Sequence, residues 1–162
     1  MALEEKVVEL LKEKNLVFAC AESCTGGLIA KRITDVSGSS AVFNCGVVSY
    51  SNEIKEKVLG VQHETLMQYG AVSEQTVREM VGGVLKISKA DVAVAVSGIA
   101  GPRSDNTEKP VGLIYIAVSD GNKIVIKELK NEFTDDVRNN NRKSAADESF
   151  KMIISLLGEG NE

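Results

Sequence analysis

Histidine and aromatic residues are scarce in this sequence. Its 162 residues include one histidine, His63, no tryptophan and only 4% aromatic side chains. A serine–histidine–aspartate triad would have to use His63, and nothing around that residue suggests such a role. With so few aromatic side chains, stacking on the bases of a single-stranded nucleic acid is also disfavoured. We expect a core built mainly from aliphatic residues.

Cysteine is scarce as well. The three cysteines, Cys20, Cys24 and Cys45, are odd in number and form no CxxC pair. This argues against a disulfide framework and against a zinc knuckle. One histidine together with scattered cysteines does not readily make a four-ligand zinc site. We therefore expect no metal ion and no other cofactor.

The chain also lacks a basic run and a long apolar run. The formal net charge is −4, which disfavours binding to duplex nucleic acid through the release of counterions. No apolar stretch approaches the roughly 18 residues needed to span a membrane. Residues 1–15 are charged and have a helical period, unlike a signal peptide. We expect a cytoplasmic protein with no nucleic-acid or membrane partner.

The composition, 43% hydrophobic and 26% charged, is typical of one globular domain over residues 1–162. Apolar spacing predicts helices over residues 3–14, 28–36, 53–60, 73–85 and 135–157, with a helical turn over 63–69. It predicts strands over residues 16–21, 43–50, 91–97, 113–118 and 123–130. The alternation of helices and strands favours a layered α/β/α domain. A hairpin turn at residues 120–122 requires at least one antiparallel strand, so the sheet is mixed.

The turn after the first predicted strand, ESCTGG, carries hydroxyl groups and glycines where only a turn is required. In open α/β sheets, ligands bind beyond the carboxyl ends of the strands. Unpaired N–H groups at the start of the next helix favour an anion or an oxyanion, and Gly26 and Gly27 let a ligand approach the backbone. The alternative is that Ser23 or Thr25 simply caps the helix. Cys24 is another candidate nucleophile, but without a nearby histidine it is expected to pack as a small hydrophobic residue.

A lysine in the helix after the second strand is the candidate base. A serine hydroxyl is a poor nucleophile until a base takes its proton. Lys55 could be that base if its amine is neutral, which burial or a cationic neighbour achieves by lowering the pKa. Tyr50 could relay the proton or orient the amine. The alternative is that Lys55 is a solvated lysine on a charged helix face with Glu53, Glu56 and Lys57.

A second glycine-bearing loop, SGIAGP, follows the third predicted strand at residues 97–102. Gly98 and Gly101 could form a backbone nest for a phosphate or a carboxylate. A tight turn explains the same residues, because glycine and proline both favour turns. The motif is therefore weak when taken alone.

Together these segments resemble the C-terminal domain of the CinA (competence/damage-inducible) family, which is also known for nicotinamide-nucleotide amidases. The matching strings are AESCTGGLIAKRITDVSGSS at 21–40, GVVSYSNEIKEKVLGV at 46–61, GAVSEQTV at 70–77, and VSGIAGP with EKPVG at 96–102 and 108–112. Several long strings in one order are far more specific than any single motif. The chain is therefore identified as a member of this family.

The resemblance implies an enzyme that hydrolyses the carboxamide of nicotinamide mononucleotide to nicotinic acid mononucleotide and ammonia, in pyridine nucleotide salvage. By matching position, Ser23 would be the nucleophile, and Tyr50 and Lys55 would activate it. Ser40, Ser97 and an arginine before the last helix would contact the substrate, and we also expect Thr25, Gly26, Gly27 and Gly98 to bind it.

The resemblance also implies an architecture and an assembly. The family fold is an α/β/α layer similar to anticodon-binding domains, with a mixed five-stranded sheet. Members are often dimers or larger, so a homo-oligomer is expected. Many carry an additional N-terminal domain similar to molybdopterin-binding proteins, which we expect this chain to lack.

Two segments depart from the family pattern. The loop after Pro102 is usually glycine-rich but here reads RSDNTE, and the segment before the last helix usually contains GDR but here reads TDDVR. Arg138 is the candidate for the substrate arginine, with Arg142 as the alternative. The departures motivate a second hypothesis, a non-catalytic nucleotide-binding or regulatory module. A third is a related amidase that acts on another carboxamide.

Overall fold

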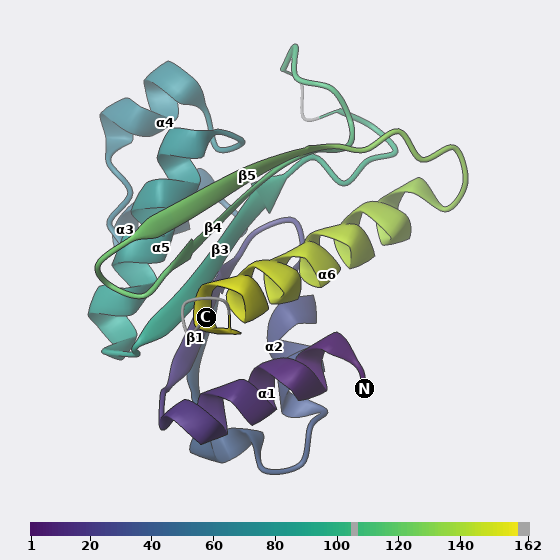
Figure 1. The fold of residues 1–162 in the computed structure, drawn as a ribbon. Coiled ribbons are helices and arrows are strands. Elements are labelled where there is room, and N and C mark those ends of the chain that lie inside the picture. Colours follow the sequence, from purple (N-terminus) through teal and green to yellow (C-terminus); the bar gives the residue numbers. More distant parts are fainter. Residues whose placement is uncertain (105–106, 159–162) are drawn as a thin grey trace.

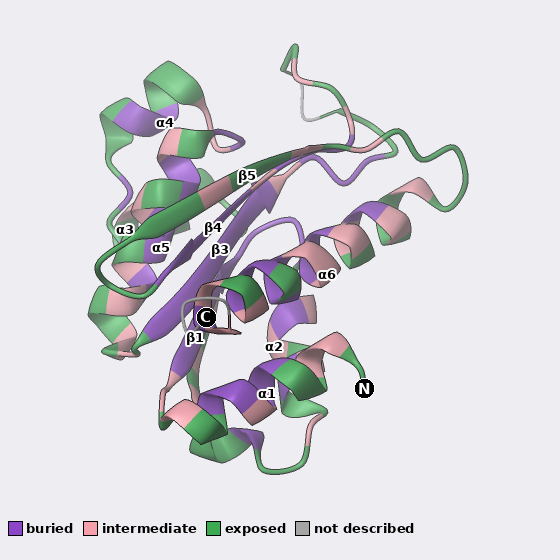
Figure 2. Ribbon diagram, in the orientation of Figure 1, coloured by how far each residue is buried: buried purple, intermediate pink, exposed green. Residues whose placement is uncertain are grey.

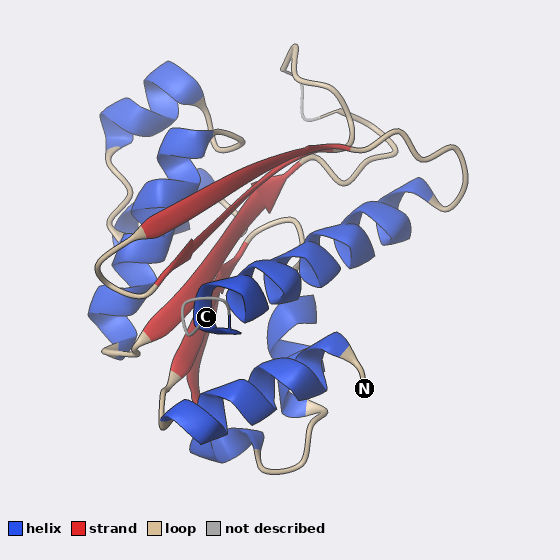
Figure 3. Ribbon diagram, viewed as in Figure 1, coloured by secondary structure: helices blue, strands red, loops and turns tan. Residues whose placement is uncertain are grey.

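The computed structural model describes residues 1–104 and 107–158, and its centre is a five-stranded sheet (Figure 3). The strands are β1 (Phe18–Glu22), β2 (Phe43–Val48), β3 (Val92–Gly98), β4 (Leu113–Ser119) and β5 (Ile124–Lys130), in the order β2-β1-β3-β4-β5. Strand β1 pairs in parallel with β2 and β3, whereas β4 is antiparallel to both of its neighbours. The sheet is therefore mixed, as the hairpin turn predicts.

Helices cover both faces of this sheet (Figure 1). One face carries α1 (Leu3–Lys14), α2 (Leu28–Thr34) and α6 (Val137–Gly158). The other carries α3 (Asn52–Leu59), α4 (His63–Tyr69) and α5 (Glu74–Ser88). The predicted three-layer α/β/α architecture is confirmed.

Successive strand residues point to opposite faces of the sheet and build two different cores. The face under α1, α2 and α6 presents mostly larger side chains, among them Val92, Val94, Val96, Ile114 and Ile116. The face under α5 presents alanines, namely Ala19, Ala21, Ala93, Ala95 and Ala117. Small side chains on this face leave room for the buried valines and the methionine of α5. Strand β5, at one edge of the sheet, is largely exposed (Figure 2).

Several element boundaries differ from the predicted ones by a few residues. Every residue of β1 is buried, as predicted for a strand covered on both faces. Strand β2 ends at Val48 rather than at residue 50, and Ser51 then caps α3 by accepting a hydrogen bond from the Ile54 N–H. The helical turn predicted over 63–69 is a helix. Among the described residues, no helix is long and apolar enough to cross a membrane.

The parallel strands β1, β2 and β3 direct three loops to the same end of the sheet, beyond the carboxyl ends of the strands. Glu22, the last residue of β1, lies beside Val48 of β2 and Val96 of β3. The chain continues from these strands into the three segments that the sequence singles out for chemistry. They therefore meet, although they are far apart in the sequence.

Candidate active site

Ser23 lies in the turn that joins β1 to α2. Its backbone N–H donates to the Val96 carbonyl oxygen (3.1 Å), and its own carbonyl oxygen accepts from the Gly26 N–H (3.0 Å). Gly26 and Gly27 have φ angles of 59° and 104°, in the left-handed region that favours glycine. The turn is therefore closed by two adjacent glycines, and Ser23 lines a cavity at this edge of the sheet.

The helix after this turn is capped by a residue of the preceding strand. Gly27 occupies the N-cap position of α2 and offers no side chain. Instead, the buried carboxylate of Glu22 accepts hydrogen bonds from the N–H groups of Gly27 (3.2 Å), Ile29 (2.9 Å) and Ala30 (3.0 Å). Sequence reasoning missed this cap, because nothing in the spacing signals that a strand residue reaches across the turn.

Neither hydroxyl of the turn caps α2, so the capping alternative is wrong. Ser23 Oγ accepts a hydrogen bond from Lys55. Thr25 is completely buried, and its Oγ1 has no hydrogen-bond partner within the described part of the chain. Because Glu22 occupies the N–H groups at the start of α2, they are not available to a bound anion, contrary to our expectation from the sequence.

Lys55 points into the protein rather than into solvent. The residue is 1% exposed, and its amine donates to Ser23 Oγ (2.9 Å) and to the Ser49 carbonyl oxygen (2.7 Å). Burial lowers the pKa of the Lys55 amine from 10.5 to about 8, because loss of solvent penalises the charged form. The solvated-lysine alternative is therefore wrong for Lys55, whereas Glu53 and Lys57 do form an exposed ion pair.

Ser23 and Lys55 line a cavity of about 620 Å³, a size typical of small-molecule sites. One wall comes from α4 and the loop after it, and another comes from the loop after β3. The basic residues of its lining are Lys55, Arg103 and Arg138, and no described aspartate or glutamate lines it. Such a lining suits a ligand that carries an anionic group.

The end of β3 and the loop after it form part of the cavity, and the β3–β4 connection is hydrogen-bonded to the segment at the end of α4. Ser97 and Gly98 both line the cavity, and a Cβ on Gly98 would lie 2.7 Å from the Ile114 side chain. Further along the same connection, the amine of Lys109 donates to the carbonyl oxygens of Tyr69 (2.6 Å) and Val72 (2.5 Å). These bonds hold the β3–β4 connection against the end of α4.

The two candidate arginines have different surroundings. Arg138 lines the cavity, and its guanidinium donates to the Gly101 carbonyl oxygen (2.7 Å) and to the Tyr50 hydroxyl (3.0 Å). Arg142, one turn further along α6, donates instead to two carbonyl oxygens of the turn that carries Ser23 (3.2 and 2.8 Å). Arg138 is therefore the arginine available to a ligand, and Arg142 supports the turn.

Tyr50 is part of the cavity lining but is 63% exposed. Within the described residues, its hydroxyl bonds only to Arg138. The structure therefore brings Tyr50 to the site without a hydrogen bond to Lys55 or Ser23.

Four predicted substrate-binding residues lie outside the cavity lining. Thr25, Gly26 and Gly27 belong to the turn but do not line the cavity. Ser40 lies in the short 3-10 helix η1 (Ser39–Ala41), which precedes β2. It therefore lies near the amino ends of the parallel strands, whereas Ser23 follows the carboxyl end of β1. The predicted residues that the structure does bring together are Ser23, Tyr50, Lys55, Ser97, Gly98 and Arg138.

Cys24, the neighbour of Ser23, is poorly suited to act as a nucleophile. Burial raises the pKa of the Cys24 thiol to about 12, so the thiol stays protonated at neutral pH. The residue packs in the hydrophobic core, as expected. Among the described residues, no group of three or more histidine, cysteine, aspartate or glutamate side chains could hold a metal ion.

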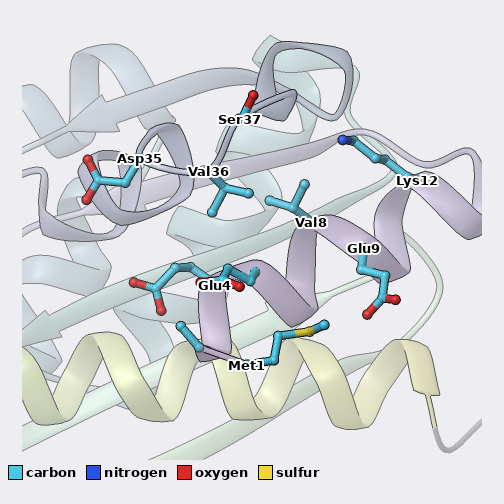
Figure 4. A pocket seen from close by; sticks show the side chains of 10 residues that line it. Met1, Glu4, Val8, Glu9, Lys12, Asp35, Val36 and Ser37 are labelled. Carbon is cyan, nitrogen blue, oxygen red and sulfur yellow. The ribbon is translucent and has the colours of Figure 1, made fainter.

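A second hollow, of about 580 Å³, lies between α1 and the segment after α2 (Figure 4). Its lining includes the acidic residues Glu4, Glu9 and Asp35. The carboxylate of Glu4 is already paired with Arg32 (2.9 Å). This hollow offers no nucleophile paired with a base, so the Ser23 cavity is the candidate active site.

Comparisons with known proteins all point to one family. The family model described as the CinA C-terminal domain matches residues 1–157. The crystal structure of competence/damage inducible protein CihA from Agrobacterium tumefaciens is 41% identical, with a TM-score of 0.87 over 95% of this chain and 94% of that chain. A competence-damaged protein (CinA) superfamily protein from Klebsiella pneumoniae is 30% identical, with a TM-score of 0.92 over 97% of this chain and 96% of that chain.

Longer relatives also match. A CinA-like protein of Thermotoga neapolitana is 50% identical over 125 residues, which make up 77% of this chain and 31% of that relative. The chain therefore spans about a third of the length of that relative. None of these three names states a reaction.

Proposed function

The chain belongs to the CinA C-terminal domain family, and from this premise we propose that it is an amidohydrolase with Ser23 as nucleophile and Lys55 as base. Its substrate is nicotinamide mononucleotide, and its products are nicotinic acid mononucleotide and ammonia. The observation that carries the proposal is the buried hydrogen bond of 2.9 Å between the Lys55 amine and Ser23 Oγ.

The dyad supplies each proton transfer that the reaction needs. The neutral Lys55 amine takes the proton of Ser23 as Oγ attacks the carboxamide carbon. The backbone N–H of Cys24, which donates to no other backbone group among the described residues, stabilises the oxyanion. Protonated Lys55 then gives its proton to the departing nitrogen, which leaves as ammonia. Water hydrolyses the acyl-enzyme with Lys55 again as base, and Ser23 is restored.

The cavity lining supports a phosphorylated substrate. Arg103 and Arg138 line the cavity together with Lys55, and no described acidic residue does. The chain has 23 acidic and 19 basic residues, so composition alone does not explain this lining. Guanidinium groups bind phosphate oxygens through charge-assisted hydrogen bonds. The apolar residues of the lining, among them Leu66, Val72 and Ile99, provide a surface for the pyridine ring.

Release of ammonia from nicotinamide mononucleotide by the purified chain tests the proposal. Ser23→Ala and Lys55→Met should each lower kcat by about 10³-fold or more, because each removes one half of the dyad. The far-UV circular dichroism spectrum should not change. Lys57→Met is the matched control, because it removes an exposed lysine from the same helix and should leave kcat unaffected.

Turnover that survives Ser23→Ala would contradict the proposed nucleophile. Nucleotide binding without ammonia release would favour the non-catalytic nucleotide-binding module instead. Release of ammonia from a different carboxamide, and none from nicotinamide mononucleotide, would support an amidohydrolase that acts on another substrate.

A further inference from the structure

Glu22 is a buried carboxylate that takes no part in the steps above. The residue is 0% exposed. Its Oε1 accepts hydrogen bonds from the N–H groups of Gly27 (3.2 Å) and Ile29 (2.9 Å), and its Oε2 accepts from the Ala30 N–H (3.0 Å). The thiol of Cys20 also donates to Oε2 (3.7 Å). A carboxylate removed from water is costly unless it is hydrogen-bonded, and here both oxygens are.

The side chain of Glu22 spans the turn that carries Ser23. Strand β1 ends at Glu22 and α2 begins at Leu28, so residues 23–27 form the whole connection. The carboxylate joins the residue before this connection to the N–H groups of Ile29 and Ala30 just after it, which fixes the two ends of the turn relative to each other. Arg142 also donates to two carbonyl oxygens within the turn.

The backbone of Glu22 reaches the other half of the dyad. Its carbonyl oxygen accepts a hydrogen bond from the Ser49 N–H (2.8 Å), and the Ser49 carbonyl oxygen accepts from the Lys55 amine (2.7 Å). Ser23 follows Glu22 directly in the chain. One residue is therefore connected to both the nucleophile and the base.

A glutamate is not the usual way to begin a helix. A serine at the N-cap accepts a hydrogen bond from one backbone N–H, and Ser51 and Ser73 cap α3 and α5 in this way. A carboxylate can accept several hydrogen bonds, and its charge strengthens each of them. The helix beside the nucleophile is thus held more firmly than an ordinary cap would hold it.

We infer that Glu22 is a positioning residue, which keeps Ser23 Oγ within hydrogen-bond distance of the Lys55 amine without touching the substrate. This inference rests on the proposed function for its catalytic readout. A displacement of about 1 Å at reacting groups costs about 10²-fold in rate. A loosened turn should therefore lower kcat, while KM, which depends on the cavity walls, should stay nearly constant.

Glu22→Gln tests the inference, because it keeps the shape of the side chain but sets an NH₂ group against backbone N–H donors. Two quantities are measured: the kinetics of ammonia release, and the rate at which a fluorophosphonate modifies Ser23, followed by mass spectrometry. The second readout does not require the amidase activity. Both kcat and the labelling rate should fall by about tenfold or more.

Two control variants separate positioning from loss of stability. Ile33→Val removes a methylene from the buried face of the same helix and leaves the cap intact. Asp91→Asn alters a carboxylate that accepts the Val17 N–H (2.8 Å) just before β1, at the opposite end of that strand from Ser23. Both should keep kcat and the labelling rate close to those of the wild type, even where the melting temperature falls.

The inference is overturned if Glu22→Gln loses no more kcat and labelling than Ile33→Val, or if its whole effect is on KM. If wild-type Ser23 is labelled but no ammonia is released, the proposed function is refuted. The labelling rates of the wild type and Glu22→Gln would still test whether Glu22 positions Ser23. If the wild type is not labelled at all, both the proposed function and the inference about Glu22 are overturned. Should Glu22→Gln fail to fold, Glu22→Asp draws the carboxylate back by one methylene and must show the same losses; wild-type values would overturn the inference.

Discussion

The amine of Lys55 is hydrogen-bonded to two oxygen atoms and almost completely excluded from water. Neither oxygen belongs to a carboxylate, so no anion compensates the charge of the protonated form through these bonds. Burial therefore lowers the pKa of Lys55 to about 8 and makes its protonation costly in the folded state. The same burial that suits the residue to act as a base opposes stability.

The stability of the protein should consequently depend on pH through Lys55. The folded-state pKa of about 8 lies below the unfolded value of 10.5, so the unfolded state binds more protons between these values and stability rises with pH across this window. Relative to Lys55→Met, the wild type should gain about 3 kcal/mol of unfolding free energy from pH 8 to pH 10.5. Urea unfolding of both proteins across this range measures the difference, and parallel curves would contradict it.

Single-residue roles were only partly predictable from the sequence. Lys55 is close in the sequence to the charged residues Glu53 and Lys57, although helical spacing places it on one face with Leu59, four residues later, and that face is buried. The Ser23 turn could be found from its hydroxyls and glycines. The role of Glu22 could not, because it depends on how close the end of β1 lies to the start of α2.

Helices α3 and α5 meet at Gly83, and this contact helps to place the helix that carries Lys55. A Cβ on Gly83 would lie 1.9 Å from the carbonyl oxygen of Leu59, the last residue of α3. Backbone atoms cannot rotate away as a side chain can. Any larger residue at this position must therefore push the two helices apart.

Two neighbouring glycines of α5 should respond oppositely to alanine. Gly82→Ala meets no atom within 4 Å, and it should stabilise the protein by up to about 1 kcal/mol through helix propensity. Gly83→Ala should destabilise the protein by about 2 kcal/mol or more, because it overpacks the contact. It should also lower kcat, since Lys55 moves with α3. Thermal unfolding measures the effects on stability, and ammonia release measures the effect on kcat. Equal melting temperatures for Gly82→Ala and Gly83→Ala would show that the contact between Gly83 and Leu59 does not determine stability.

Whole elements were easier to predict than their orientation. Apolar spacing predicts the strands and helices because each must bury one or both faces. It does not decide between Arg138 and Arg142, which are four residues apart and thus neighbours on one helix surface. Only the packing of α6 against the Ser23 turn directs Arg142 to that turn and leaves Arg138 at the cavity.

The molecule as a whole is acidic, with a formal net charge of −4, whereas its cavity lining contains basic residues and no described acidic ones. A cleft lined by one sign of charge concentrates field lines and attracts ligands of the opposite sign. The overall repulsion of anions is therefore reversed locally at the site.

Catalysis on a phosphorylated substrate should accordingly weaken in salt. Raising the ionic strength from about 0.01 M to about 0.15 M shortens the Debye length from about 30 Å to about 8 Å. We expect kcat/KM for nicotinamide mononucleotide to fall by about threefold or more, whereas the value for the nucleoside without its phosphate should not fall. Arg138→Gln should reduce the dependence of kcat/KM on salt concentration. Steady-state kinetics over a salt series measures this, and identical slopes for the two substrates would exclude an electrostatic contribution.

The carboxylate of Glu22 leaves the start of α2 with no free N–H groups for a guest molecule. The task of attracting charge passes to Arg103 and Arg138, which come from a loop and a helix that contain neither Ser23 nor Lys55. Under the proposed function, the reacting pair and the residues that select the substrate thus lie in separate stretches of the chain. Varying the two arginines should therefore redirect the proposed amidase toward uncharged amides while Ser23 and Lys55 stay as they are.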